Sequence, residues 1–441
     1  MSAKPPVAVR IAILGCGNVG RALVEILTDP DHADALAARA GSAIEIVGIA
    51  VNDVSRQRSD APWFPSHLLT DDPSGLVARD DVDLVVELLG GIEPAGSLIE
   101  AALSSGKPVV TANKALIAVS GGRLSTLAAA NGVDLNFEAA VAGAIPVIRT
   151  LRESLAGERI SRVMGIVNGT TNFILTKMAD DGEDYDAVLA EAQMLGLAER
   201  DPSADVEGGD AAAKAAILAS LAFGADISLD DVHREGISRV RTVDVAFAHR
   251  LGYAVKLLAI AEQVGPGEVS ARVHPAMVPL AHPLASVGGA YNAVFIEGET
   301  CGSLMLYGQG AGGAPTASAV LGDIIDAARH LIAGSTSPAP VRDLGLMAVP
   351  MDDLRAEFYV AIDVADRPGV LATVATAFGA HSVSIRSMEQ VGLGDEARLI
   401  FLTHQATERD MAATVATLEA LDVVDAVGGV LRVVGVDEGV S

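Results

Sequence analysis

The chain has 441 residues, enough for two or three domains, and carries a formal net charge of −26. That charge argues against nucleic acid and anionic membranes as partners, because both are bound by patches of lysine and arginine. Only two cysteines, Cys16 and Cys301, are present, and the N-terminus has no secretory signal pattern, so we expect a cytoplasmic protein without disulfides.

Short apolar runs alternate with helical patterns over the first part of the chain. Strands are predicted at residues 9–14, 44–51, 83–89, 108–111 and 133–137, and helices at 21–27, 94–105 and 122–130. Strands that alternate with helices indicate an α/β fold with a doubly wound parallel sheet of the Rossmann type. We place this domain at residues 8–137.

A glycine-rich turn, GCGNVG at residues 15–20, follows the first predicted strand and opens the first predicted helix. Glycines in this position allow a tight turn and a close approach of the backbone to a pyrophosphate, which then faces the start of the helix. An ordinary glycine-rich turn is the alternative. We expect a bound nicotinamide dinucleotide, contacted by Gly15, Gly17, Asn18, Val19 and Gly20.

The choice between the two nicotinamide cofactors depends on the end of the second strand. NAD enzymes usually carry an acid there that binds the ribose hydroxyls, but Asp53 lies slightly beyond that place. Arg56 and Arg58 follow it and could pair with a 2′-phosphate, although a solvated surface loop would look the same. We favour NADP(H), with NAD(H) as the alternative.

Residues 138–335 lose the strict alternation. Helices are predicted at 185–195, 210–223, 250–263 and 316–332, and strands at 268–275, 292–297 and 303–307. The uncharged runs 276–296 and 301–322 contain too many prolines and glycines for membrane helices. We expect an α+β domain for substrate binding and dimerisation, whose last helix can return to the first domain, and a linker at 336–355.

Two lysines and three acids are candidates for the chemistry. Lys114 follows a predicted strand, at the edge where open α/β sheets bind ligands. Lys214 is the only charged residue in 211–223, and a lysine on a buried helix is rare unless it is paired or functional. Such a lysine can exchange a proton, whereas a surface ion pair with Asp210 is the alternative. Glu199, Asp205 and Asp210 offer acceptors for a substrate ammonium group.

The run AQMLGLAERDPSADVEGGDAAAK at residues 192–214 resembles the homoserine dehydrogenase signature at every defined position. Segments 111–114, 165–172 and 308–316 are also similar to that family, and the resemblance covers roughly residues 8–335. It implies reduction of L-aspartate 4-semialdehyde to L-homoserine, which serves threonine, methionine and isoleucine biosynthesis. It further implies Lys214 as proton donor, Lys114 as its partner near the nicotinamide, Glu199 and Asp210 as substrate ligands, and Gly310 beside the cofactor.

The resemblance also implies a monovalent cation, usually Na+, at residues 138–145. Its ligands would be the carboxylate of Glu138 and the backbone carbonyls of Val141, Gly143 and Ile145, since hard cations prefer oxygen. From the residues alone, Glu138 is an ordinary strand-end acid. The nine histidines show no spacing typical of zinc sites.

The tail predicts strands at 358–364, 383–388, 398–403 and 430–434 and helices at 369–378 and 409–421, a ferredoxin-like βαββαβ unit at 356–435. The run DRPGVL at 366–371 resembles an ACT domain, a module that binds amino acids between copies of a chain. This implies feedback by a small amino acid, possibly threonine, and a homodimer or homotetramer. The alternative is a unit used only for dimerisation.

Two other functions compete with an ACT-containing homoserine dehydrogenase. The chain could be a non-catalytic amino-acid sensor, but the presence of Lys114, Lys214 and the glycine turn favours an enzyme. It could also be another amino-acid or hydroxy-acid dehydrogenase with an ACT tail, although no His–carboxylate pair stands at a matching place.

Overall fold

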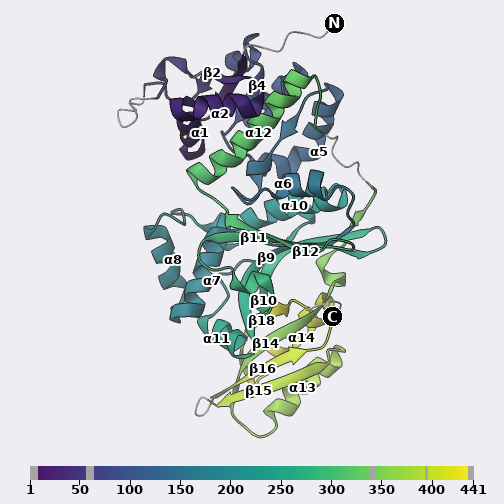
Figure 1. The fold of residues 1–441 in the computed structure, drawn as a ribbon. Coiled ribbons are helices and arrows are strands. Elements are labelled where there is room, and N and C mark those ends of the chain that lie inside the picture. The colour runs from purple at the N-terminus through teal and green to yellow at the C-terminus, as the bar shows by residue number, and fades with distance from the viewer. Residues whose placement is uncertain (1–7, 56–63, 338–343, 393–395, 436–441) are drawn as a thin grey trace.

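The structure, a computed structural model, describes residues 8–55, 64–337, 344–392 and 396–435. Figure 1 shows three parts arranged along the long axis of the molecule: an N-terminal α/β part, a middle part around long strands, and a C-terminal module. In the described residues, no helix is both long enough and apolar enough to cross a membrane.

The N-terminal part is a six-stranded sheet in the order β3-β2-β1-β4-β5-β6, in which every paired strand is parallel. The predicted Rossmann-type fold is therefore confirmed. The sequence missed α2, although Asp29 caps it and Pro30 occupies its first turn, both ordinary start signals. Its elements are β1 Ala8–Leu14, α1 Asn18–Thr28, α2 Pro30–Ala40, β2 Ala43–Ala50, η1 Ser66–Leu68, β3 Leu69–Thr70, α3 Pro73–Ala78, β4 Leu84–Glu87, α4 Ala95–Ser104, β5 Val109–Thr111, α5 Lys114–Ala130 and β6 Leu135–Asn136.

The middle part is built on strands in the order β12-β11-β7-β9-β10, each antiparallel to the next strand in this order. Its strands are β7 Ile160–Ile166, β8 His233–Arg234, β9 Tyr253–Gly265, β10 Glu268–Pro279, β11 Tyr291–Gly298, β12 Gly302–Gln309 and β13 Met347–Ala348. Its helical elements are η2 Glu138–Ala140, α6 Val147–Arg149, η3 Thr150–Ser154, α7 Gly169–Asp181, α8 Tyr185–Met194, α9 Ser203–Val206, α10 Gly209–Phe223, η4 Leu229–Asp231, α11 Thr242–Arg250, η5 Pro283–Ser286 and α12 Gly313–Ala333.

The helix predicted at residues 250–263 was wrong. The chain instead ends α11 at Arg250 and runs on as β9, which pairs with β10 from Tyr253 to Gly265 and with β7 on its other side. Most of β9 is buried on both faces, so its apolar run lacks the alternation that distinguishes a strand from a buried helix. The tertiary pairing decided the conformation.

Helix α12 crosses back to the first part, as Figure 1 shows. Its buried side chains Ala317, Val320 and Ile324 belong to one apolar cluster with residues of β1 and α1, among them Ile11 and Leu23. The start of α12 lies beside the glycine-rich turn, because a Cβ on Gly313 would lie 3.0 Å from the carbonyl oxygen of Asn18.

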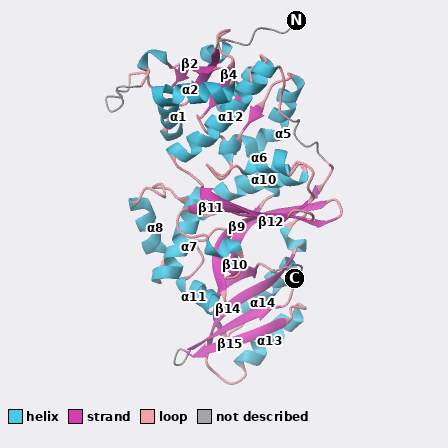
Figure 2. Cartoon of the chain, in the orientation of Figure 1, coloured by secondary structure: helices cyan, strands magenta, loops and turns pink. Residues whose placement is uncertain are grey.

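The C-terminal module has the sheet order β18-β14-β16-β15 and a helix on each crossover, so the predicted ferredoxin-like unit is confirmed. Its last strand also pairs in parallel with β10, through Ala276 and Arg432, and Figure 2 shows the strands of the two parts in succession. The module is therefore joined to the middle sheet through hydrogen bonds. Its elements are η6 Met351–Asp353, β14 Arg355–Ala365, α13 Val370–Ala380, β15 Ile385–Gly392, β16 Glu396–Thr403, β17 Ala406–Thr407, α14 Glu408–Glu419 and β18 Val424–Val433.

Candidate active site

The glycine-rich turn has the geometry that a dinucleotide requires. Gly15 has a φ of +100°, and a Cβ there would lie 2.6 Å from the carbonyl oxygen of Leu88. A Cβ on Gly20 would lie 2.4 Å from the carbonyl oxygen of Gly15, whereas nothing lies within 4 Å of the Cβ position of Gly17. Gly17 is the N-cap of α1, and the N–H groups of Asn18 and Val19 in the first turn have no acceptor inside that helix. Helix starts of this kind are the places where backbone N–H groups bind phosphates.

The segment after β2, where we expect the cofactor to be selected, lies only partly within the described residues. Asp53 is exposed, and its Oδ1 accepts hydrogen bonds from the backbone N–H (2.8 Å) and the hydroxyl (2.6 Å) of Ser55. That oxygen is therefore already engaged within its own turn. Arg56 and Arg58, which we expected to select NADP(H), lie outside the described residues.

Two lysines from different parts of the chain meet at one carboxylate. Lys214 Nζ donates to Asp210 Oδ2 at 2.7 Å and to the carbonyl oxygen of Val167 at 2.6 Å, and Lys114 forms an ion pair with Asp210 Oδ1. The side chain of Lys214 is 10% exposed and that of Lys114 is 46% exposed. This cluster, Lys114–Asp210–Lys214, is thus closed at Lys214 and open to solvent at Lys114.

Local structure explains how the cluster forms. Lys114 is the first residue of α5, directly after β5, and Asn113 caps the helix by accepting from Leu116 N at 3.1 Å. Helix α5 begins eight residues earlier than predicted. Asp210 and Lys214 lie one turn apart at the start of α10. Because Lys114 and Gly15 both follow parallel strands of one sheet, the cluster lies at the same sheet edge as the dinucleotide turn.

The charge of Asp210 is stabilised by the cluster. Burial alone would raise its pKa, but the ammonium groups of Lys214 and Lys114 outweigh burial and hold the pKa below its usual range. The carboxylate therefore remains ionised at neutral pH, where it can orient both ammonium groups toward a reacting oxygen.

Asn168 connects the cluster to Asp205, and we had not assigned it a role from the sequence. Its Oδ1 caps α7 by accepting from Thr171 N at 2.9 Å, while its Nδ2 donates to Asp205 Oδ1 at 2.7 Å and to Asp210 Oδ2 at 2.9 Å. Burial, with repulsion from Asp210, raises the pKa of Asp205 despite the Asn168 bond. The sequence signal for Asn168 was its place directly before Gly169, where α7 begins, because asparagine is a preferred helix-capping residue.

Glu199 is not held in the cluster. It lies in the exposed loop between α8 and α9, and in the described part of the chain its carboxylate makes no hydrogen bond to the cluster. The loop itself is anchored: Thr170 Oγ1 donates to the carbonyl oxygen of Leu197 at 2.6 Å, and Gln193 Nε2 donates to that of Glu199 at 3.1 Å.

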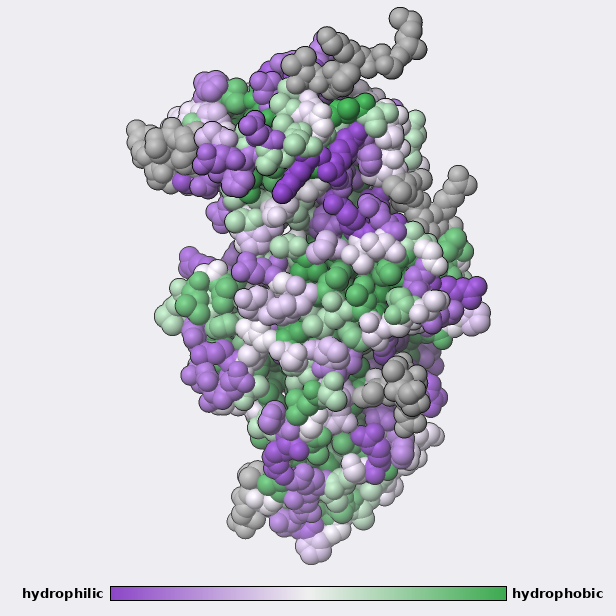
Figure 3. Space-filling view, in the orientation of Figure 1, coloured by the Kyte–Doolittle hydropathy of each residue, from purple (hydrophilic) through white to green (hydrophobic). Residues whose placement is uncertain are grey.

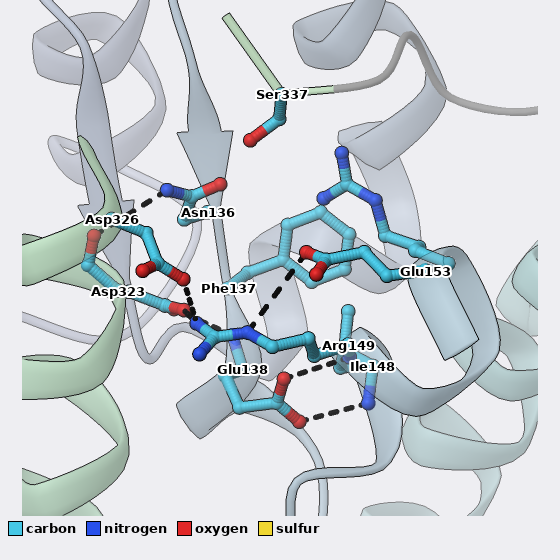
Figure 4. A pocket seen from close by; sticks show the side chains of 10 residues that line it. Asn136, Phe137, Glu138, Ile148, Arg149, Glu153, Asp323, Asp326 and Ser337 are labelled. Atoms are coloured by element: carbon cyan, nitrogen blue, oxygen red, sulfur yellow. Dashed lines mark hydrogen bonds and ion pairs between the residues drawn. The ribbon is translucent and has the colours of Figure 1, made fainter. Parts of the chain in front are cut away.

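Glu138 lines a polar pocket between α6 and α12, drawn in Figure 4. Its Oε1 and Oε2 accept from the backbone N–H groups of Ile148 and Arg149, each at 2.8 Å, and burial raises its pKa. Asp323 Oδ2 accepts from Glu138 N at 2.8 Å, and Asp323 Oδ1 accepts from Arg149 at 3.1 Å. Burial, followed by the charge of Glu138, raises the pKa of Asp323 to about 7.

The loop that carries Val141, Gly143 and Ile145 follows Glu138 directly and packs against Gly310. A Cβ on Gly143 would lie 2.6 Å from the carbonyl of Gly310, and a Cβ on Gly310 would lie 1.9 Å from Asn292 Nδ2. The carbonyl oxygen of Ile145 accepts from Val147 N at 2.8 Å. The structure thus brings the expected cation loop beside the expected cofactor residue Gly310.

Three family matches cover most of the chain. The homoserine dehydrogenase NAD-binding domain matches residues 15–138, the homoserine dehydrogenase family matches 146–325, and the ACT domain matches 358–423.

Known homoserine dehydrogenases resemble this chain in both sequence and structure. A homoserine dehydrogenase of Mycobacterium bovis is 52% identical over 437 residues, which cover 97% of this chain and 98% of the relative. The crystal structure of a homoserine dehydrogenase from Thiobacillus denitrificans matches with a TM-score of 0.90 at 40% identity, covering 97% of this chain and 98% of that one. A hyperthermophilic archaeal homoserine dehydrogenase in complex with NADPH matches with a TM-score of 0.61 at 32% identity, covering 73% of this chain and 97% of that one.

Proposed function

Because the chain belongs to the homoserine dehydrogenase family of NAD(P)-dependent oxidoreductases, we propose that its Lys114–Asp210–Lys214 cluster is the catalytic centre. The reaction is the NAD(P)H-dependent reduction of L-aspartate 4-semialdehyde to L-homoserine. The observation that supports this role is the single buried carboxylate of Asp210, which holds two lysines at the sheet edge that bears the dinucleotide turn.

Each member of the cluster has a distinct role in this proposal. Lys214 donates a proton to the aldehyde oxygen, which becomes the hydroxyl of homoserine, and Lys114 stabilises charge on that oxygen from the solvent side. Asp210 orients both lysines. A bound nicotinamide supplies the hydride for the aldehyde carbon. Asp205 and Asp210 accept hydrogen bonds from the substrate ammonium group, with Glu199 as a further acceptor on the loop between α8 and α9.

The direct test is the appearance of reduced nicotinamide absorbance when L-homoserine is supplied with NADP+ or NAD+. Rapid turnover with homoserine, and none with 2-hydroxy acids, is the expected result. A chain that binds amino acids but turns over neither class would instead be a sensor.

For the cofactor we propose a preference for NADP(H), selected by Arg56 with help from Arg58, while NAD(H) remains usable. The archaeal relative in complex with NADPH supports this choice, as does the engagement of Asp53 by Ser55. Replacing Arg56 with serine should raise the KM for NADPH by about 10-fold or more and leave that for NADH nearly unchanged, because only NADPH carries the 2′-phosphate. Steady-state kinetics with both cofactors provide the measurement, Arg39→Ser is a matched surface control, and equal effects on the two cofactors would contradict the assignment.

We propose that Glu138 and the carbonyls of Val141, Gly143 and Ile145 hold a monovalent cation, Na+ in the first instance. All these donors are oxygens, which fits a hard cation, and no cluster of three or more His, Cys, Asp or Glu suited to a metal occurs in the described ranges. Turnover that is indifferent to replacing Na+ by a large organic cation would contradict this proposal.

We propose that the ACT domain binds a small amino acid, possibly threonine, and thereby lowers activity. Helix α13 begins at Val370, whose N–H donates to the carbonyl oxygen of Arg367 at 3.3 Å, so at the Asp366–Leu371 turn the N–H groups of Leu371 and Ala372 are the ones proposed to bind a ligand carboxylate. Titration calorimetry with threonine, alongside activity, is the check. The module would be purely structural if neither threonine nor the other aspartate-family amino acids bound to the enzyme or changed its activity at millimolar concentration.

We propose that the enzyme is a cytoplasmic homodimer or homotetramer that associates through the β11–β12 face. Figure 3 shows apolar surface gathered over these strands, β12 is the edge strand of the sheet, and Tyr291 and Tyr307 stack there at 5.1 Å while remaining 41% and 54% exposed. Light scattering measures the number of subunits.

The domain boundaries we propose, 8–137, 138–335 and 356–435 around a 336–355 linker, are supported by the three family matches.

A further inference from the structure

The junction between the ACT domain and the catalytic part contains a partly buried ion cluster that the proposed chemistry does not use. Arg432 lies on β18, where that strand pairs with β10, and its side chain is only 12% exposed. Its Nε and Nη2 donate to the two carboxylate oxygens of Glu408 at 2.9 and 2.7 Å, and its Nη1 forms an ion pair with Glu235. Arg432 therefore joins one carboxylate of its own module to one of the catalytic part.

Glu235 is itself tightly held. Its other oxygen bonds His233 Nε2 at 2.9 Å, and its backbone N–H donates to the carbonyl oxygen of Val273 on β10 at 2.7 Å. Although burial opposes it, the bonds to His233 and Arg432 lower the pKa of Glu235 to about 2. At neutral pH the side chain is a charged anchor between β10 and the ACT domain.

The backbone next to this anchor packs directly on the segment between the two substrate-site aspartates. Ile237 N donates to the carbonyl oxygen of Val206 at 2.8 Å, and a Cβ on Gly236 would lie only 2.2 Å from that same oxygen. A Cβ on Gly208 would lie 3.2 Å from the carbonyl oxygen of Glu235. Residues 206–208 connect Asp205 to the start of α10, so little room exists for them to move independently of Glu235.

We propose that Glu235 and Arg432 are positioning residues through which the ACT domain sets the placement of Asp205 and Asp210, and hence the affinity for the amino-acid substrate. This inference rests on the proposed function only for the identity of that substrate. A ligand that shifts β18 would change the substrate site through the Glu235–Arg432 ion pair, and the module could regulate activity in this way.

The test compares Glu235→Gln with the matched control Glu408→Gln. Both variants remove one carboxylate charge from Arg432, but only Glu235 adjoins the 206–208 segment. Glu235→Gln should raise the KM for homoserine by about 5-fold or more while kcat and cofactor affinity change much less, and it should weaken any amino-acid inhibition. Glu408→Gln should leave the KM for homoserine near wild type.

Hydrogen exchange supplies a readout that does not depend on turnover. The backbone N–H of Ile237 should exchange faster in Glu235→Gln and not in Glu408→Gln, because its hydrogen bond to the carbonyl oxygen of Val206 opens more often. Equal exchange and equal KM in the two variants, or no change in Glu235→Gln, would overturn the inference. A wild-type enzyme that ignores homoserine would refute the proposed function, while the exchange result would still decide this one. If Glu235→Gln does not fold, Arg432→Lys replaces it, since an ammonium group cannot hold both carboxylates in a fork.

Discussion

Replacing Lys214 with alanine should lower kcat for homoserine oxidation by about 10²- to 10⁴-fold while leaving cofactor affinity close to wild type. The ammonium group is buried, and its only described partners are Asp210 and the carbonyl oxygen of Val167, at 2.7 and 2.6 Å. It is therefore free to direct its remaining proton toward a substrate. Its loss removes the proposed proton donor without touching the Gly15–Gly20 turn. Steady-state kinetics and NADPH fluorescence titration measure the two effects.

Lys177→Ala is the matched control, because Lys177 forms ordinary helix-surface ion pairs with Asp181 and Glu191 at 2.8 and 3.3 Å. Its kcat should stay near wild type. A small primary amine added to Lys214→Ala should restore part of the lost rate, which a purely structural lysine would not show. A Lys214→Ala enzyme within about threefold of wild type in kcat would remove Lys214 from the mechanism.

Replacing Asp210 with alanine should abolish turnover and also destabilise the fold by about 3–5 kcal/mol, the usual cost of leaving a buried charge without its partner. Lys214 Nζ would retain only the carbonyl oxygen of Val167 as an acceptor in a buried site, and Lys114 would lose its ion pair. Urea unfolding at neutral pH measures the stability, and homoserine kinetics measure the activity.

The stability difference should also depend on pH in a defined direction. The folded pKa of Asp210 lies below its unfolded value of about 3.9, so its stabilisation is complete above that pH and is lost as the pH falls through the folded pKa. Wild type and Asp210→Ala should therefore converge in strong acid. Asp181→Ala, which breaks an exposed ion pair, should leave the free energy of unfolding nearly unchanged. Unchanged stability of Asp210→Ala at neutral pH would contradict the paired-charge arrangement.

The parts of the fold that were predicted correctly depend on local patterns. The glycine-rich turn between a strand and a helix, the alternation of the first domain and the βαββαβ order of the tail all depend on residues a few positions apart, and the structure confirms them. Residues 253–265 show where this fails. A strand buried on both faces and a buried helix share the same apolar composition, so only the pairing of β9 with β7 and β10 separates them.

The candidate site divides in the same way. Lys214 could be singled out from the sequence because it is the one charge on an apolar helix, and its distance to Asp210 follows from helical geometry. Three other contacts were decided only by the packing of distant segments. Lys114, 96 positions earlier in the chain, meets the same carboxylate. The amide of Asn168 joins Asp205 to Asp210, and Arg432 reaches Glu235. Periodicity and local spacing determine which residues share a helix face or a turn. Contacts between elements depend on how whole sheets and helices bury their apolar surfaces together, which no short stretch of sequence encodes.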